Sequence, residues 1–193
     1  MALLCSTILL SPGTAGTVDG QIWVELGRVQ KLQASFTQTQ HRAILKDPLV
    51  STGTVTFSRP DRLDWNVQSP APSHFLLEGS VATMEYPALG VSERVDLSAV
   101  PEANRIATSM MVWLKADPAQ VEREFTVTWR QDPPGATLRP KDAKLAGILA
   151  EIQLNFLPGP WRVSSVNLKE PSGDLVHISF RDVVLDGQRM PDP

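Results

Sequence analysis

The feature that most constrains the fold is a succession of short segments in which apolar and polar residues alternate, separated by turns that contain proline or glycine. Residues 32–37 follow this pattern, and Leu63, Trp65 and Val67 share one face of a later segment. A period of two is typical of a strand with one buried face. Because these segments follow one another closely, the sequence predicts a meander of antiparallel strands.

About ten strands and two helices, one short and one long, are expected from these patterns. The first helix is predicted after Asp19, a residue suited to capping, because Ile22, Leu26 and Val29 recur at helical spacing. The second helix is predicted over residues 101–117, which start at a proline and stop before another. The predicted fold class is therefore α+β, dominated by one antiparallel sheet.

Size and charge narrow the classes of function. The 193 residues suffice for one domain with a sizeable core. The formal net charge is -3 and no run of lysine or arginine occurs, so the chain lacks the clustered cations that nucleic-acid binding needs. We expect a monomer that does not bind nucleic acid.

The motifs of common catalytic sites are absent from the sequence, including the serine elbow, the Walker loop and the HExxH zinc motif. His41, His74 and His177 lie far from one another in the chain. We therefore expect no enzymatic activity, no metal and no cofactor. The enzymatic alternative is a hydrolase whose acidic residues come from distant parts of the chain.

The N-terminus resembles a secretory signal peptide. An apolar run, residues 2–10, precedes a Pro-Gly turn and a small-residue site that ends at Ala15, although a basic start is missing. We expect residues 1–15 to be removed and residues 16–193 to form one domain. Removal would take away Cys5, the one cysteine of the chain. The alternative is an apolar terminus that is not a signal.

A single sheet of so many strands must curl, and its concave face then gathers large apolar side chains. The candidates for this face are Phe36, Phe57, Leu63, Trp65, Val67, Phe125, Trp129 and Phe156. If the helices cover the concavity without filling it, an apolar pocket suited to an acyl chain results. The alternative is that these side chains fill a dry core.

Three motifs carry a resemblance to a known family. An A-S-F-x-Q strand occurs at residues 34–38, a G-x₅-R-P-x-x-L-x-W segment at residues 53–65, and an E-G turn leading to Tyr-Pro at residues 78–87. Together they resemble the periplasmic outer-membrane lipoprotein carriers, the LolA-like proteins. The resemblance covers residues 19–115 with good order and spacing, and the C-terminal half fits it loosely.

The resemblance implies an unclosed barrel of about 10–11 strands, with helices covering a hydrophobic cavity. It implies a periplasmic carrier that shields the acyl chains of lipoproteins. Such a carrier takes its cargo from an inner-membrane ABC-type releasing complex and passes it to an outer-membrane acceptor. The cargo-binding residues would be Phe36, Phe57, Leu63, Trp65, Val67, Met110 and Trp113, with Leu63 near the mouth of the cavity.

The resemblance also implies that Arg59 acts as a latch that hydrogen-bonds the lid helices. Pro60 ends the ladder of one strand, because it has no N–H to donate. Arg59 can then reach carbonyls at a helix C-terminus, where a cation is favourable by about 0.3–1 kcal/mol. Two alternatives remain: a carrier of another envelope lipid or glycolipid intermediate, and a structural envelope domain with a filled core.

Overall fold

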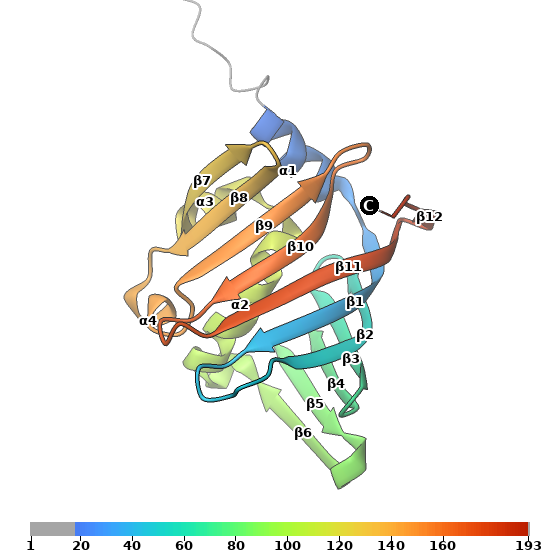
Figure 1. The fold of residues 1–193 in the computed structure, drawn as a ribbon, viewed down its shortest axis with the longest axis vertical. Coiled ribbons are helices and arrows are strands. Elements are labelled where there is room, and N and C mark those ends of the chain that lie inside the picture. The colour runs from blue at the N-terminus through green and yellow to red at the C-terminus, as the bar shows by residue number, and fades with distance from the viewer. Residues whose placement is uncertain (1–17, 193) are drawn as a thin grey trace, which may run out of the picture.

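The computed structural model describes residues 18–192, and within them all side chains except those at positions 18–19, 102–103, 105–106 and 108–110. The predicted signal peptide and the side chain of Asp19, predicted to cap the first helix, therefore lie outside the described part of the structure. One large antiparallel sheet dominates the fold (Figure 1). It curls around helices that lie on its concave side.

The sheet contains 12 strands. In chain order they are β1 (Lys31–His41), β2 (Leu49–Ser58), β3 (Arg62–Ser69), β4 (Ser73–Glu78), β5 (Val81–Tyr86), β6 (Val91–Asp96), β7 (Phe125–Gln131), β8 (Pro134–Pro140), β9 (Glu151–Leu157), β10 (Arg162–Lys169), β11 (Leu175–Leu185) and β12 (Gln188–Arg189). Their spatial order is β6-β5-β4-β3-β2-β1-β11-β10-β9-β8-β7, with β12 paired to β11. Because β6 and β7 stand at the two ends of this order, the sheet is curled but not closed.

Within residues 18–192, four α-helices and two short 3₁₀ turns complete the fold. They are α1 (Val18–Arg28), η1 (Pro87–Leu89), η2 (Leu97–Ala99), α2 (Pro101–Lys115), α3 (Pro118–Glu124) and α4 (Ala143–Ala146). α2 packs against both α1 and α3, and it runs behind the strands in the view of Figure 1. The concave face of the sheet is therefore covered mainly by α1 and α2.

The predicted α+β class and the curled, unclosed antiparallel sheet are confirmed. The sheet has 12 strands rather than the expected 10 or 11. The excess is explained by β12, whose two residues are too few to show an alternation.

The predicted second helix was too long at its C-terminus, and a third helix was missed. α2 ends at Lys115, because Ala116 adopts a left-handed conformation with φ of 46°. α3 then starts at Pro118, and the Asp117 carboxylate caps it by accepting hydrogen bonds from the backbone N–H groups of Ala119 and Gln120. An aspartate before a proline is a recognised start signal for a helix, so this helix could have been predicted.

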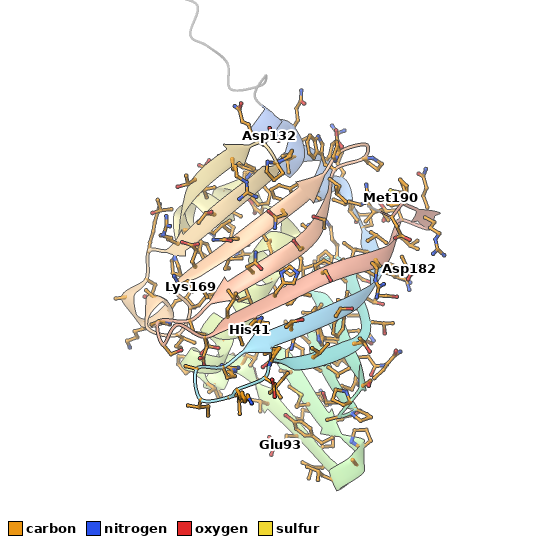
Figure 2. The ribbon with its side chains drawn as sticks, in the orientation of Figure 1. His41, Glu93, Asp132, Lys169, Asp182 and Met190 are labelled. Carbon is orange, nitrogen blue, oxygen red and sulfur yellow. The ribbon has the colours of Figure 1, made fainter. Side chains whose placement is uncertain are left out.

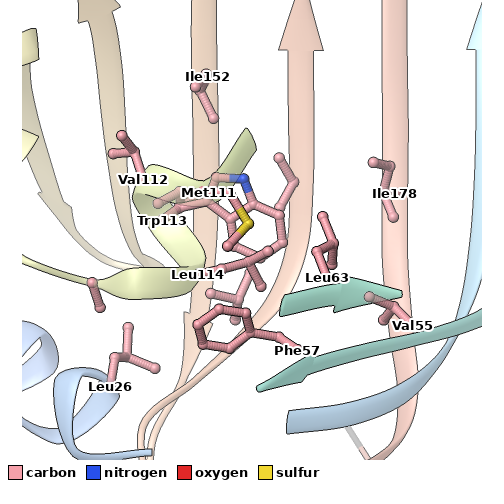
Figure 3. Packing of buried hydrophobic residues seen from close by; sticks show 14 of the residues in the cluster. Leu26, Val55, Phe57, Leu63, Met111, Val112, Trp113, Leu114, Ile152 and Ile178 are labelled. Carbon is pink, nitrogen blue, oxygen red and sulfur yellow. The ribbon is translucent and has the colours of Figure 1, made fainter. Parts of the chain in front are cut away.

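The interior is packed at the end of the sheet where α1 lies. The Trp23 ring of α1 lies 5.6 Å from the Trp129 ring and 6.2 Å from the Phe156 ring, measured between centroids, and both contacts are edge-on. Figure 3 shows further members of this core, with Leu26 of α1, Phe57 of β2 and Leu114 of α2 converging. Two spaces described beside Leu114 measure only about 20 and 10 Å³, so the described side chains around it are closely packed.

Candidate functional site

The first of two apolar hollows lies beneath β3, β4, β5 and β6, and we call it the β3–β6 hollow. Its volume is about 470 Å³, within the range of about 300–1,000 Å³ usual for ligand pockets. Its apolar lining residues are Trp65, Val67, Phe75, Ala82, Met84, Val95, Leu97 and Ala107. Ala107 belongs to α2, so this helix covers a floor made by the strands.

The second hollow lies beneath β9, β10 and β11, and we call it the β9–β11 hollow. Its volume is about 240 Å³. Its apolar lining residues are Trp65, Trp113, Leu145, Ile148, Leu149, Ile152, Val166, Leu168, Val176 and Ile178. It lies toward the end of the sheet that His41 and Lys169 mark in Figure 2, because Leu168 and Val176 come from the strand ends there.

Trp65 lines both hollows and stands between them. Its indole ring stacks on the Phe36 ring at 4.2 Å between centroids and an interplanar angle of 27°. Gly53 makes room for this stack, since a Cβ atom there would stand 2.9 Å from Phe36 Cζ and 2.0 Å from the Asn66 backbone oxygen. The glycine of the second sequence motif is therefore required by a close approach.

Three of the predicted cargo-binding residues line a hollow: Trp65 lines both, Val67 the β3–β6 hollow and Trp113 the β9–β11 hollow. Phe36 lines neither hollow and instead supports Trp65. These positions describe where the side chains lie, and their contact with cargo stays a prediction.

The other predicted cargo-binding residues lie elsewhere. Phe57 and Leu63 are each only 1% exposed and belong to the packed core, where they line neither hollow. The side chain of Met110 lies outside the described part of the structure. For these three residues a role in binding also stays a prediction.

Arg59 joins the C-terminal ends of the two covering helices. Its Nε donates to the Val29 carbonyl at 2.7 Å, and its Nη2 donates to the Lys115 carbonyl at 2.7 Å and to the Leu26 carbonyl at 3.3 Å. Carbonyls at a helix C-terminus lack partners within the helix and carry partial negative charge. One cation on the β2–β3 connection therefore satisfies the ends of both α1 and α2.

A small ion-pair cluster lies beside the β9–β11 hollow. Arg42 Nη1 donates to Glu170 at 2.8 Å and to Asp174 at 3.1 Å, and Glu170 also lines the hollow. The pKa of Asp174 is lowered, first because its carboxylate accepts a hydrogen bond from the backbone N–H of Ala43 and then because of Arg42. The cluster ties the β1–β2 loop to the β10–β11 turn.

Several lining residues were missed by sequence reasoning. They come from β4, β5, β6, β10 and β11 and from the segment after α4, and they are Phe75, Ala82, Met84, Val95, Leu149, Leu168 and Val176. Alternation in these strands was visible in the sequence. It indicates which residues face inward, but it does not distinguish a side chain that borders a hollow from one that packs.

The described residues contain no cluster of three or more His, Cys, Asp or Glu side chains that could hold a metal ion. Among the helices within residues 18–192, none is long and apolar enough to span a membrane. The chemistry of the described hollows is thus dominated by hydrocarbon, with Gln38 and Glu170 at one and Ser73 and Glu93 at the other.

A family model of known proteins matches most of this amino-acid sequence. Residues 27–191 match the model described as outer membrane lipoprotein carrier protein LolA. The chain belongs to this family. Membership in the LolA family places it among carrier-type proteins that bind lipids or lipoproteins. Among curated proteins, no sequence matches the chain.

Solved structures share the fold of this LolA-family chain at low sequence identity. A DUF1329 family protein from Desulfovibrio piger has a TM-score of 0.52 and 9% identity, and the match covers 88% of this chain and 93% of that one. A putative outer membrane lipoprotein-sorting protein domain from Vibrio parahaemolyticus has a TM-score of 0.51 and 10% identity, covering 86% and 90%. At such identity the likeness supports the fold alone.

Proposed function

We propose that the protein is a periplasmic carrier that shields the acyl chains of lipoproteins within its two hollows and moves them from the inner to the outer membrane. It performs no catalysis. It receives its cargo from an ABC-type releasing complex and delivers it to an outer-membrane acceptor. The observation that carries the proposal is the pair of apolar hollows beneath α2, in a chain of the LolA family.

Protein interiors are filled so well that voids larger than a water molecule are few. Hollows of about 470 and 240 Å³ with mostly apolar walls are too large to be packing defects. Burying an acyl chain contributes about 0.8 kcal/mol per CH₂ group. Filling these hollows with hydrocarbon is therefore strongly favourable.

Binding of an acylated peptide tests this proposal. We expect the delipidated protein to bind a fluorescent triacylated peptide, and Ala82→Glu to lower the affinity at least tenfold, because a carboxylate would then be placed among apolar walls. Thr83→Glu is the matched control, because Thr83 is the neighbour of Ala82 on β5 and does not line the hollow. Binding that is equal in both variants and in the unchanged protein would contradict the proposal. A glycolipid that binds while the triacylated peptide does not would identify the other class of envelope lipid as cargo.

The proposal gives Arg59 the role of a latch on the cover. Replacing Arg59 by leucine removes its hydrogen bonds to the carbonyls of Leu26, Val29 and Lys115. We expect the α1 and α2 amides to exchange hydrogen faster and bound cargo to dissociate several-fold faster, while the melting transition stays cooperative.

Arg62→Leu is the control for the latch, because Arg62 lies three residues away and pairs with Glu78 at an exposed position. It should leave both the exchange of the helices and the release of cargo unchanged. A loss of the cooperative melt in Arg59→Leu would mark Arg59 as a structural residue and remove the latch from the proposal.

A further inference from the structure

The described interior offers two apolar hollows, and their walls come mainly from different halves of the sheet. The β3–β6 hollow is built on the N-terminal strands, and the β9–β11 hollow on the C-terminal strands. Among the side chains that the structure describes, Trp65 is the lining residue that the two have in common. A chain reaching from one hollow into the other would run alongside this side chain.

The position of Trp65 is fixed from several sides. Phe36 stacks on it from β1, and the absence of a side chain at Gly53 allows that stack. The Trp65 side chain is only 9% exposed. A stacked aromatic pair is worth about 0.5–1.5 kcal/mol beyond the area that it buries. The indole therefore serves as a supported wall rather than a mobile surface group.

The two hollows also have unequal volumes and polar groups at different places. The larger one, of about 470 Å³, has Glu93 of the edge strand β6 in its lining. The smaller one, of about 240 Å³, has Glu170, which is held by Arg42. Each hollow thus has its own carboxylate beside an apolar interior.

We propose that Trp65 divides the interior into two acyl compartments, each of which accepts one hydrocarbon chain of the same cargo. The inference rests on the proposed carrier function and specifies it. The preferred cargo is a lipid or lipid anchor with at least two chains, which straddles the Trp65 wall. The larger compartment takes the longer or more branched chain.

Stoichiometry with a single-chain probe tests the compartments. Native mass spectrometry of the delipidated protein with hexadecanoic acid should show saturation at two molecules per chain. Ala82→Trp fills the β3–β6 hollow and Val176→Trp fills the β9–β11 hollow. Each variant should saturate at one molecule. Thr83→Trp, at a position that lines neither described hollow, should still saturate at two.

The outcomes separate this inference from the function on which it rests. Saturation at one molecule in the unchanged protein, or loss of both molecules in either filled variant, would overturn the two compartments and leave the carrier function standing. No binding of hexadecanoic acid or of the triacylated peptide would overturn both.

A second measurement on the unchanged protein does not depend on a variant that folds. Joining two chains makes the second binding event intramolecular, which raises affinity by about 10²–10⁴-fold when both sites can be reached at once. Dipalmitoyl phosphatidylglycerol should therefore bind at least 100-fold more tightly than the matching single-chain lysolipid. Equal affinity for the two lipids would overturn the inference.

Discussion

The two ends of the curled sheet are built from the same kind of strand and differ in what fills them. At the α1 end, Trp23 of the helix reaches the concave face and packs against Trp129 and Phe156. At the opposite end, the strands face hollows of about 470 and 240 Å³. The difference shows that the covering helices, more than the strands, decide whether the interior becomes a core or a container.

The packed end and the hollow end should also contribute differently to the stability of the fold and to the binding of cargo. Shortening a side chain in a packed region removes contacts on all its sides. A side chain that borders a hollow has neighbours on one side only, so shortening it removes fewer contacts. The packed end should therefore hold the fold together while the hollow end adapts to cargo. Matched substitutions at the two ends test this division.

The largest effect is expected from shortening an aromatic residue at each end. Phe156→Ala should lower the free energy of unfolding by about 3–5 kcal/mol, because Phe156 is 3% exposed and lies between two tryptophans. Phe75→Ala, at the wall of the β3–β6 hollow, should cost less than about 2 kcal/mol. Urea denaturation measures both, and equal losses would show that the two ends are packed alike.

A smaller effect is expected from the opposite kind of substitution, which enlarges an alanine at each end. Ala34→Leu should destabilise the protein by about 1–3 kcal/mol, because Ala34 borders a space of only about 10 Å³. Ala82→Leu should be nearly neutral, since Ala82 borders the large hollow, but it should weaken lipid binding. Thermal melts and lipid titration would measure both changes, and a strongly destabilised Ala82→Leu would mean that this hollow closes in solution.

The smallest effect concerns pH at the hollow end. The folded-state pKa of Asp174 is lowered by the Ala43 N–H and by Arg42, so it lies below the unfolded value of about 3.9. The stability that this carboxylate provides is present above the unfolded pKa and is lost as the pH falls through the folded pKa. The Tm of Asp174→Asn should thus fall less steeply than that of the unchanged protein below about pH 4. Parallel Tm curves would show that the contact contributes nothing.

The sequence predicted the sheet well because alternation is a direct consequence of strand geometry. Residues such as Phe36 and Trp65 were placed on the inner face from their spacing alone, and their burial agrees with it. The helix boundaries were also nearly right. The exception is α3, which was not predicted although the Asp117-Pro118 pair indicates a helix start.

The boundary between core and hollow was not predictable in the same way. Phe57 and Trp65 follow the same alternation, yet Phe57 lies in the packed core and Trp65 borders both hollows. Their surroundings depend on residues far away in the chain. Trp23 is one of these, and it lies beside Ile22 in the sequence, off the stripe that predicted its helix. The empty volume beside an inward-facing side chain depends on tertiary contacts, and the alternation of apolar and polar residues carries no information about these contacts.

The order of the strands has a consequence for how the protein is made. β1, near the beginning of the chain, lies between β2 and β11, and Leu32 pairs with Leu185. Pairings between such distant segments are slow to form, because a long loop must close first. During synthesis, the edge of β1 therefore stays unpaired until β11, the last long strand, has been made. Factors that protect nascent chains from aggregation should matter most during that interval.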